Sequence, residues 1–128
     1  MPVKYLSQEW IDAYNAVLAS DDAVRAALKG KSAAIQMAIS DSPQGEIRYW
    51  LRIADGGASA GLGDLDDADV TISQSYETSA QVNKGELVGQ KAFTQGKVKI
   101  KGKMLKMMQL RGPLGHVQTA LATIDTEY

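Results

Sequence analysis

The sequence predicts an α+β domain of the sandwich type, in which helices cover one face of a mixed, mainly antiparallel five-stranded sheet. Apolar residues recur at helical spacing over residues 7–28, then alternate strictly with other residues over 33–53. Alternation returns at 97–101, and helical spacing follows it. Because the predicted strands are apolar on one face only, we expect helices on that face and water on the other. No repeat or linker interrupts the 128 residues, so residues 1–128 are expected to form one domain.

Two helices are expected before the first strand. Ser7 is placed to cap the first helix, and Asp21 or Ser20 to cap the second. The second helix runs through Leu28 and ends at Gly30. One face of the first helix carries an apolar stripe of Trp10, Tyr14, Val17 and Leu18.

The strand signals bracket turns rich in glycine, proline and aspartate. Residues 42–45 form the turn of a hairpin, Asp55-Gly56-Gly57 forms a second turn, and residues 64–69 form an acidic loop. The predicted strands are 33–40, 47–53, 58–62, 70–73 and 97–101.

Short helices are expected over 75–82 and 87–93, and a methionine-rich helix over 103–110. Gly112-Pro113 should end that helix, because proline lacks an amide donor and disfavours a helical residue before it. Residues 114–124 would then form a separate final helix, weakly tethered and able to act as a lid.

Basic residues are concentrated in residues 84–111, which contain eight Lys or Arg residues and one acidic residue, although the whole chain has a net charge of −1. A net charge near zero argues against bulk nucleic-acid binding. The basic segment is either an ordinary solvated surface or a positive rim that contacts lipid headgroups or an anionic membrane. The candidate contacts are Lys97, Lys99, Lys101, Lys103 and Lys106.

Patterns typical of enzymes, metal sites and phosphate loops are incomplete in this sequence. His116 is the only histidine, and no G-x-S-x-G motif accompanies it. Counted from Asp64 as an EF-hand loop, the sixth position is Asp69 and the twelfth is Ser75, where glycine and glutamate are needed. Glycines 56–63 lack the G-K-[ST] of a phosphate loop, and there is no cysteine. No catalytic residue, metal or cofactor is therefore expected.

Trp50 is predicted on the polar face of its strand, between Arg48 and Arg52. Either the two arginines stack on the indole ring, or the ring marks a homodimer contact through the open sheet face.

The segment 84–102 carries a family resemblance. Gly85-Glu86-Leu87, Gln90-Lys91-Ala92-Phe93 and Gln95-Gly96-Lys97-Val98-Lys99-Ile100-Lys101-Gly102 occur in that order, preceded by Asp69-Val70-Thr71-Ile72. This sequence resembles the sterol carrier protein 2 (SCP-2) domain over roughly residues 7–125. The resemblance implies a lipid carrier without enzymatic activity, with an apolar tunnel between the sheet and its helices.

Methionine side chains adapt to irregular apolar ligands, so the methionines after residue 103 are the best ligand candidates, although ordinary core packing would use them too. The expected ligand is a sterol, a fatty acid or a fatty acyl-CoA. Alternative roles are presentation of a lipid-like substrate, such as a quinone precursor, to an enzyme, or a structural dimerisation module. A cytoplasmic location is expected, because no membrane span or signal peptide is evident. The predicted lining is Met37, Tyr49, Leu51, Phe93, Ile100, Met104, Met107, Met108, Leu110 and Leu121.

Overall fold

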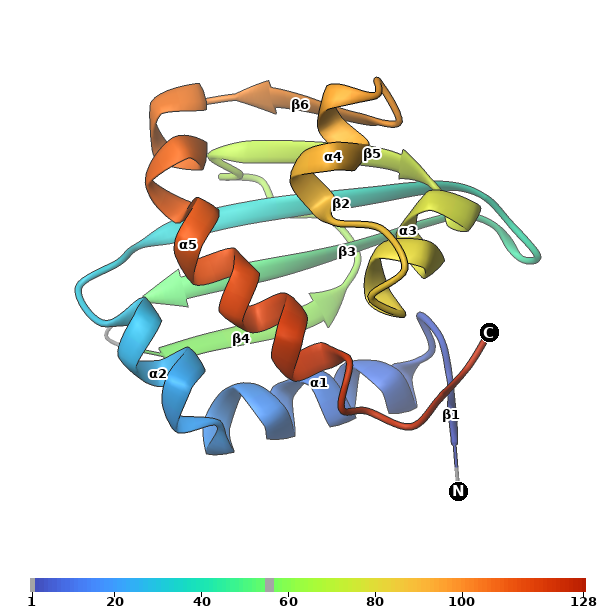
Figure 1. Cartoon of the computed structure of the whole chain (residues 1–128), viewed down its shortest axis with the longest axis horizontal. Coiled ribbons are helices and arrows are strands. Elements are labelled where there is room, and N and C mark those ends of the chain that lie inside the picture. The colour runs from blue at the N-terminus through green and yellow to red at the C-terminus, as the bar shows by residue number, and fades with distance from the viewer. Residues whose placement is uncertain (1, 55–56) are drawn as a thin grey trace.

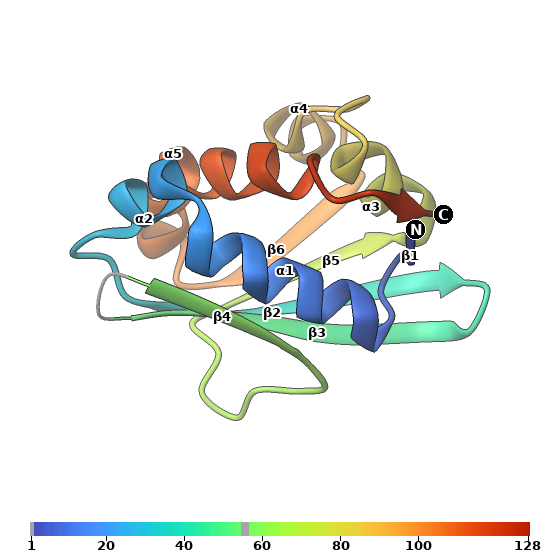
Figure 2. The same ribbon diagram turned by 90° about the horizontal axis from the view of Figure 1, so that it is seen from below.

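The computed structural model describes residues 2–54 and 57–128. Its main element is a five-stranded sheet in the order β4-β3-β2-β5-β6. β2 runs parallel to β5, and the other neighbouring pairs are antiparallel. The helices gather on one face, as Figure 2 shows. The predicted fold class is therefore confirmed. The strands are β2 (Ala33–Ser42), β3 (Gly45–Ala54), β4 (Gly57–Leu62), β5 (Val70–Ser75) and β6 (Val98–Gly102).

The two N-terminal helices, α1 (Gln8–Ser20) and α2 (Asp22–Leu28), agree with the prediction. The Ser7 hydroxyl accepts a hydrogen bond from the Trp10 amide, and the Asp21 carboxylate accepts one from the Val24 amide, so each helix has the N-cap expected of it. The apolar stripe of α1 is buried against the sheet, except that Val17 is only partly buried. Two further short helices, α3 (Tyr76–Asn83) and α4 (Gly89–Thr94), lie near their predicted positions.

The predicted break at Gly112-Pro113 is wrong, because a single helix, α5 (Met104–Leu121), runs through it. Proline clashes with the side chain of the residue before it, and Gly112 has no side chain. Buried Leu110, Val117 and Leu121 on either side of Pro113 anchor the helix to the core. This packing outweighs the roughly 3 kcal/mol that an internal proline costs.

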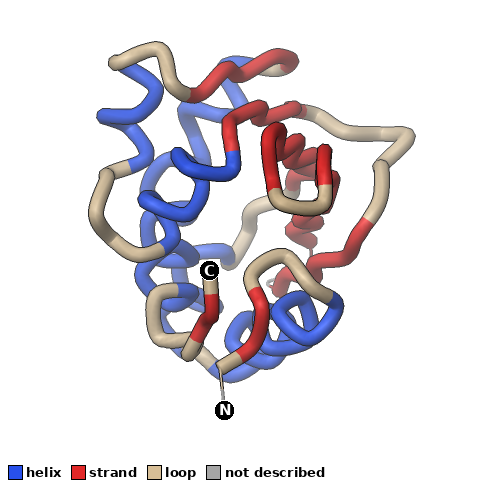
Figure 3. Tube along the Cα trace, turned by 90° about the vertical axis from the view of Figure 1, so that its right-hand side faces the viewer, coloured by secondary structure: helices blue, strands red, loops and turns tan. Residues whose placement is uncertain are grey.

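The two ends of the chain form a contact that the sequence pattern does not reveal. β1 (Val3–Lys4) pairs in parallel with β7 (Thr126–Glu127), and the termini lie side by side in Figure 3. The Tyr128 ring also packs on Tyr5, with ring centroids 4.8 Å apart, and the Lys84 ammonium lies 4.7 Å above the Tyr128 ring. The segment after α5 is therefore tied to the first strand and to the end of α3, and the weak tether predicted for it is not observed.

The face of the sheet opposite the helices is partly covered, contrary to the prediction that it is open to water. The segment between β4 and β5 folds back under the sheet (Figure 2). Gln36 is only 2% exposed beneath this segment. Its side-chain amide donates to the carbonyls of Tyr49 and Gly63, each at 3.0 Å, and accepts from the Leu65 amide at 2.7 Å. One buried side chain thus fastens the acidic loop to the sheet.

The arginines beside Trp50 bind this acidic loop. Arg48 pairs with Asp64, and Arg52 pairs with Asp67 at 2.8 Å. The indole ring of Trp50 lies on Gly61 of the neighbouring strand, where an added Cβ would collide with the ring. Trp50 is therefore held by its cross-strand neighbour, and a homodimer contact there stays a prediction. The predicted turn at Asp55-Gly56 falls on residues that the structure does not describe.

Asp69 joins three elements at the start of β5. Its carboxylate accepts hydrogen bonds from the Ala34 amide at 2.8 Å and from the Lys103 ammonium at 3.0 Å. These two bonds, the Ala34 one first, hold the pKa of Asp69 below its usual range. The Asp69 backbone amide also donates a hydrogen bond to the Ala34 carbonyl, and the Asp69 carbonyl accepts one from the Lys103 amide. Gly102 lies against the same backbone with φ +115, and an added Cβ would collide with the Asp69 carbonyl oxygen.

Replacing Gln36 with leucine should lower the free energy of unfolding by about 1–3 kcal/mol, because the loop amide and two carbonyls lose their buried partner. Urea denaturation would measure this change, and amide exchange at Leu65 should accelerate. Gln44→Leu, at an exposed position of the β2–β3 turn, is the control. Equal stabilities of the two variants would mean that the loop does not depend on Gln36.

Replacing Asp69 with asparagine should lower the free energy of unfolding by about 1–2 kcal/mol at pH 7, because two charge-assisted hydrogen bonds weaken. Since folding lowers the pKa of Asp69, its contribution is complete above the unfolded-state pKa of about 4 and is lost as the pH falls through the folded-state pKa.

Wild-type protein and Asp69→Asn should therefore converge in stability below about pH 4. Denaturation curves at several pH values would test this, with the exposed Asp66→Asn as the control. A stability difference that stays constant from pH 7 to pH 3 would contradict the role given to the carboxylate.

Candidate functional site

An apolar row crosses the helix-covered face of the sheet. Strand register places Tyr49 of β3 beside Met37 of β2, Met37 beside Ile72 of β5, and Ile72 beside Ile100 of β6. Three of these four side chains were predicted to line a ligand site, and the structure brings them together. We call this set of four residues the floor row.

The floor row is not fully covered by the helices. Met37 lies on the central strand, yet it is only partly buried, and so is Ile100. In Figure 1, α5 runs diagonally over the sheet from the end of β6 toward α1, whereas α3 and α4 lie on the other side of it. A side chain on the inner face of a central strand is normally among the best buried, whereas the helices leave part of Met37 uncovered.

Apolar side chains also remain exposed on the two flanking helices. Phe93 of α4 is 44% exposed, Met104 is 43% exposed, and Met108 is 62% exposed. Leu105 was not among the predicted lining residues, yet it is 70% exposed beside them. The first turns of α5 therefore carry apolar surface that the protein's own core does not bury. We call Phe93, Met104, Leu105 and Met108 the apolar edge.

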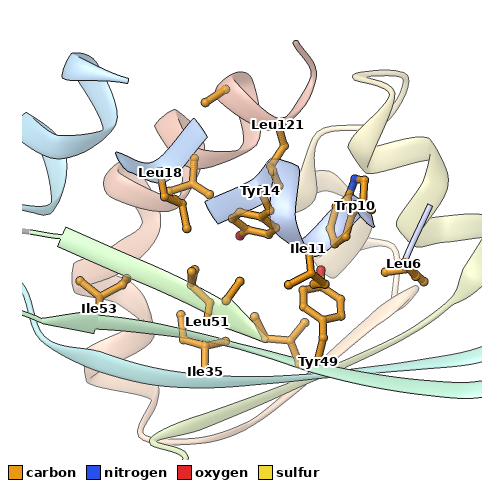
Figure 4. Packing of buried hydrophobic residues seen from close by; sticks show 14 of the residues in the cluster. Leu6, Trp10, Ile11, Tyr14, Leu18, Ile35, Tyr49, Leu51, Ile53 and Leu121 are labelled. Carbon is orange, nitrogen blue, oxygen red and sulfur yellow. The ribbon is translucent and has the colours of Figure 1, made fainter. Parts of the chain in front are cut away.

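The other predicted lining residues belong to the packed core. Leu51 lies under α1, and Leu110 and Leu121 are on the inner face of α5, all of them buried (Figure 4 labels Leu51 and Leu121). Met107 is partly buried against the same core. Helical spacing alone could not show that Leu110 is buried and Met108 is exposed, because this depends on which face of α5 meets the sheet.

The predicted basic contacts are divided between two environments. Lys103 and Lys106 lie 3.0 and 3.6 Å from the Asp69 carboxylate, so both are partly neutralised by the fold. Lys99 and Lys101 are exposed on the edge strand β6, and Lys97 is exposed directly before it. Because Val98 and Ile100 face the helices, Lys99 and Lys101 point to the opposite face of the sheet. The exposed lysines and the apolar edge therefore lie at the same edge of the sheet, but Lys99 and Lys101 point away from the helix-covered face.

Other functional features are limited in the part of the chain that the structure describes. His116 is exposed on α5, and the described residues contain no group of three or more acidic or histidine side chains able to hold a metal ion. Among them, no helix is both long and apolar enough to cross a membrane. An open hollow of about 870 Å³ lies beside α2, lined by Asp22, Arg25, Ala26, Lys29, Gly30, Lys31 and Ser32. It does not include the floor row, so the apolar tunnel stays a prediction.

Several solved structures have a similar fold. Sterol carrier protein 2 in a crystal structure is 20% identical, with a TM-score of 0.80 over 94% of this chain and 99% of that chain. A conserved hypothetical protein of Thermus thermophilus is 20% identical, with a TM-score of 0.79 over 98% and 92% of the two chains. The palmitated SCP2L2 of Aedes aegypti is 16% identical, with a TM-score of 0.60 over 94% and 99%. At these identities the likeness establishes the fold alone.

Comparison with curated protein sequences finds no match. The sequence model of the SCP-2 sterol transfer family does match, over residues 14–115. That range extends from the buried stripe of α1 to the middle of α5, and so includes the floor row, the apolar edge and Asp69. The chain therefore belongs to the SCP-2 sterol transfer family.

Proposed function

We propose that this protein binds a lipid above the floor row and transfers it between membranes, without catalysing a reaction. We propose sterols, fatty acids and fatty acyl-CoA as the ligand classes. Membership of the SCP-2 sterol transfer family supports the proposal, and one structural neighbour from Aedes aegypti was solved in a palmitated form.

The observation that carries the proposal is apolar surface left uncovered at one end of the helix-covered face. Met37 and Ile100 are only partly buried on the floor, and the apolar edge is exposed on α4 and on the first turns of α5. An acyl chain lying between α4 and α5 would cover both sets of side chains. Methionine suits such a site, because its flexible, polarisable side chain adapts to ligands of different shape.

Burial of the ligand provides enough free energy without any catalytic group. Each methylene moved out of water contributes about 0.8 kcal/mol, so a chain of roughly a dozen methylenes gains about 10 kcal/mol before association costs. Micromolar affinity corresponds to about 8 kcal/mol. The site therefore needs only moderately efficient packing to hold a lipid at micromolar concentrations.

We further propose that β6 brings this end of the molecule to anionic membranes. Lys97, Lys99 and Lys101 are exposed, and no carboxylate of the described residues forms an ion pair with them. Each basic residue near an anionic bilayer contributes about 1 kcal/mol of attraction. Contact through β6 would hold the apolar edge close to the lipid that enters or leaves.

The apolar edge can be tested with a double variant, Met104→Gln and Met108→Gln. Because the lipid would no longer bury two thioether side chains, its affinity should fall by roughly tenfold, which corresponds to about 1.4 kcal/mol. Titration with a fluorescent fatty acid measures this change. Leu62→Gln, at a position 42% exposed on the opposite edge strand β4, is the matched control. Equal affinities of the double variant and the control would place the lipid elsewhere.

The membrane contact can be tested by replacing Lys97, Lys99 and Lys101 with glutamine. Transfer of a fluorescent lipid to anionic vesicles should slow several-fold, whereas transfer to neutral vesicles and equilibrium affinity should not change. Added salt should slow the wild-type protein similarly, because the screening length is about 10 Å at 0.1 M. Replacing Lys4, Lys29 and Lys31 with glutamine removes the same charge from other elements and should leave transfer unchanged. Equal effects of both triple variants would indicate a general charge effect and not a contact at β6.

A further inference from the structure

The two outermost strands of the sheet differ in what lies along their outer sides. β4 is closed at Ala60 by Asn15 of α1, whose side-chain amide donates to the Ala60 carbonyl at 2.9 Å and accepts from the Ala60 amide at 2.8 Å. This pair of bonds reproduces what a neighbouring strand would supply. On the other side of the sheet, no helix or strand lies beyond β6 in Figure 1. The described part of the chain therefore leaves β6 without such a closure.

The register of β6 shows which of its backbone groups face outward. The Lys103 amide donates to the Asp69 carbonyl, and the antiparallel pairing of β6 with β5 continues from there. Because bonded and non-bonded pairs alternate along an antiparallel ladder, the residues two and four positions before Lys103 also bond to β5. The backbones of Val98 and Ile100 then point away from β5, and among the described residues no backbone group elsewhere bonds to them. Their amides and carbonyls are therefore available to a further strand.

The side chains along β6 are basic on one face of the sheet, and apolar side chains lie near its ends on the other. Lys99 and Lys101 point to the face opposite the helices, and neither forms an ion pair with a carboxylate of the described residues. On the helix-covered face, the Lys97 amide bonds to the Ala92 carbonyl at the end of α4, and α5 begins two residues after β6 ends. The apolar edge, which α4 and α5 carry, is therefore near both ends of β6.

A second copy of this chain is a poor partner for the outer side of β6. Two copies paired through this strand would bring their lysines together on one face, and like charges on adjacent strands are destabilising. Lysines on an outermost strand commonly prevent pairing of this kind. The same lysines would attract a strand with acidic side chains, because opposite charges on adjacent strands are favourable. The charge of β6 therefore disfavours pairing of two copies and favours an acidic segment.

We propose that β6 binds an extended segment of a partner protein as an additional strand, and that acidic residues alternate with apolar residues in this segment. Its acidic side chains would lie beside Lys99 and Lys101, and its apolar side chains would lie on the helix-covered face with the apolar edge. The inference goes beyond lipid carriage, because it assigns a protein partner to this strand. The segment would use the same lysines as the proposed membrane contact, so a bound partner and an anionic membrane would exclude each other.

The probe is a short fluorescein-labelled peptide in which glutamate alternates with valine, and its affinity for the full-length protein is measured by fluorescence anisotropy. The double variant Lys99→Gln and Lys101→Gln should bind it roughly three- to tenfold more weakly, as expected for the loss of cross-strand charge pairs. The double variant Lys29→Gln and Lys31→Gln, between α2 and β2, removes the same charge and is the matched control. It should leave the affinity unchanged, and equal losses in the two double variants would overturn the inference.

Two further peptides distinguish strand pairing from charge attraction alone. One carries N-methyl groups on its valine amides and the other on its glutamate amides, so their charges are the same. Successive amides of a strand point to opposite sides, so only one of the two sets can face β6. One methylated peptide should therefore bind about tenfold more weakly than the other, because it loses several backbone hydrogen bonds. Equal affinities would mean that charge alone holds the peptide, which overturns the inference.

Amide exchange of the full-length protein locates the contact. The outward amides of Val98 and Ile100 should exchange quickly in the free protein and become protected when the unmethylated peptide is added. Protection confined to other parts of the chain would overturn the inference. If anionic vesicles bind but the peptide leaves these two amides unprotected, β6 serves only the membrane. The inference then fails, and the proposed lipid carriage stands without it.

Discussion

The close approach of Asp69, Ala34 and Gly102 fixes the point at which α5 starts over the sheet. At this point β5 meets β2 through paired hydrogen bonds, and the chain leaves β6 for α5 through Lys103. Any side chain at position 102 would collide with the Asp69 carbonyl, so the exit from β6 depends on glycine. Because α5 starts here, the same contacts place its exposed first turns, which carry Met104, Leu105 and Met108, next to the end of β6.

Helix α5 is held at both ends by polar contacts. Lys103 and Lys106 meet Asp69 at its start, and the segment after Leu121 pairs with the first strand. In the middle, Pro113 leaves the Gln109 carbonyl without its usual amide donor. Buried Leu110 and Val117 on either side of Pro113 compensate for that lost bond, so α5 stays packed against the core along its length.

The sequence predicts those parts of this fold in which local chemistry agrees with packing. The caps at Ser7 and Asp21 and the alternation of β2 and β3 identify their elements directly. Where packing overrides local preference the prediction fails, as at Pro113, where buried Leu110 and Val117 keep the helix intact. The floor row could be predicted only as a set of candidates, since its order depends on β2 pairing in parallel with a strand over 30 residues away. Gln36 fitted the periodic pattern of its strand, so the sequence carried no signal that its side chain fastens the acidic loop.

The pairing of β1 with β7 has a consequence for how the protein is made. The amides of Val3 and Tyr5 cannot donate to the carbonyls of Asp125 and Glu127 until those residues have been synthesised and have left the ribosome. The Tyr5 ring likewise cannot pack against the Tyr128 ring until Tyr128 has been made. Until then, part of the aromatic cluster around Trp10 lacks its cover, and exposed apolar surface of this kind invites wrong association. Translation and closure of the fold are thus coupled, because residues 3–5 find their partners only after the segment around residue 126 has been made.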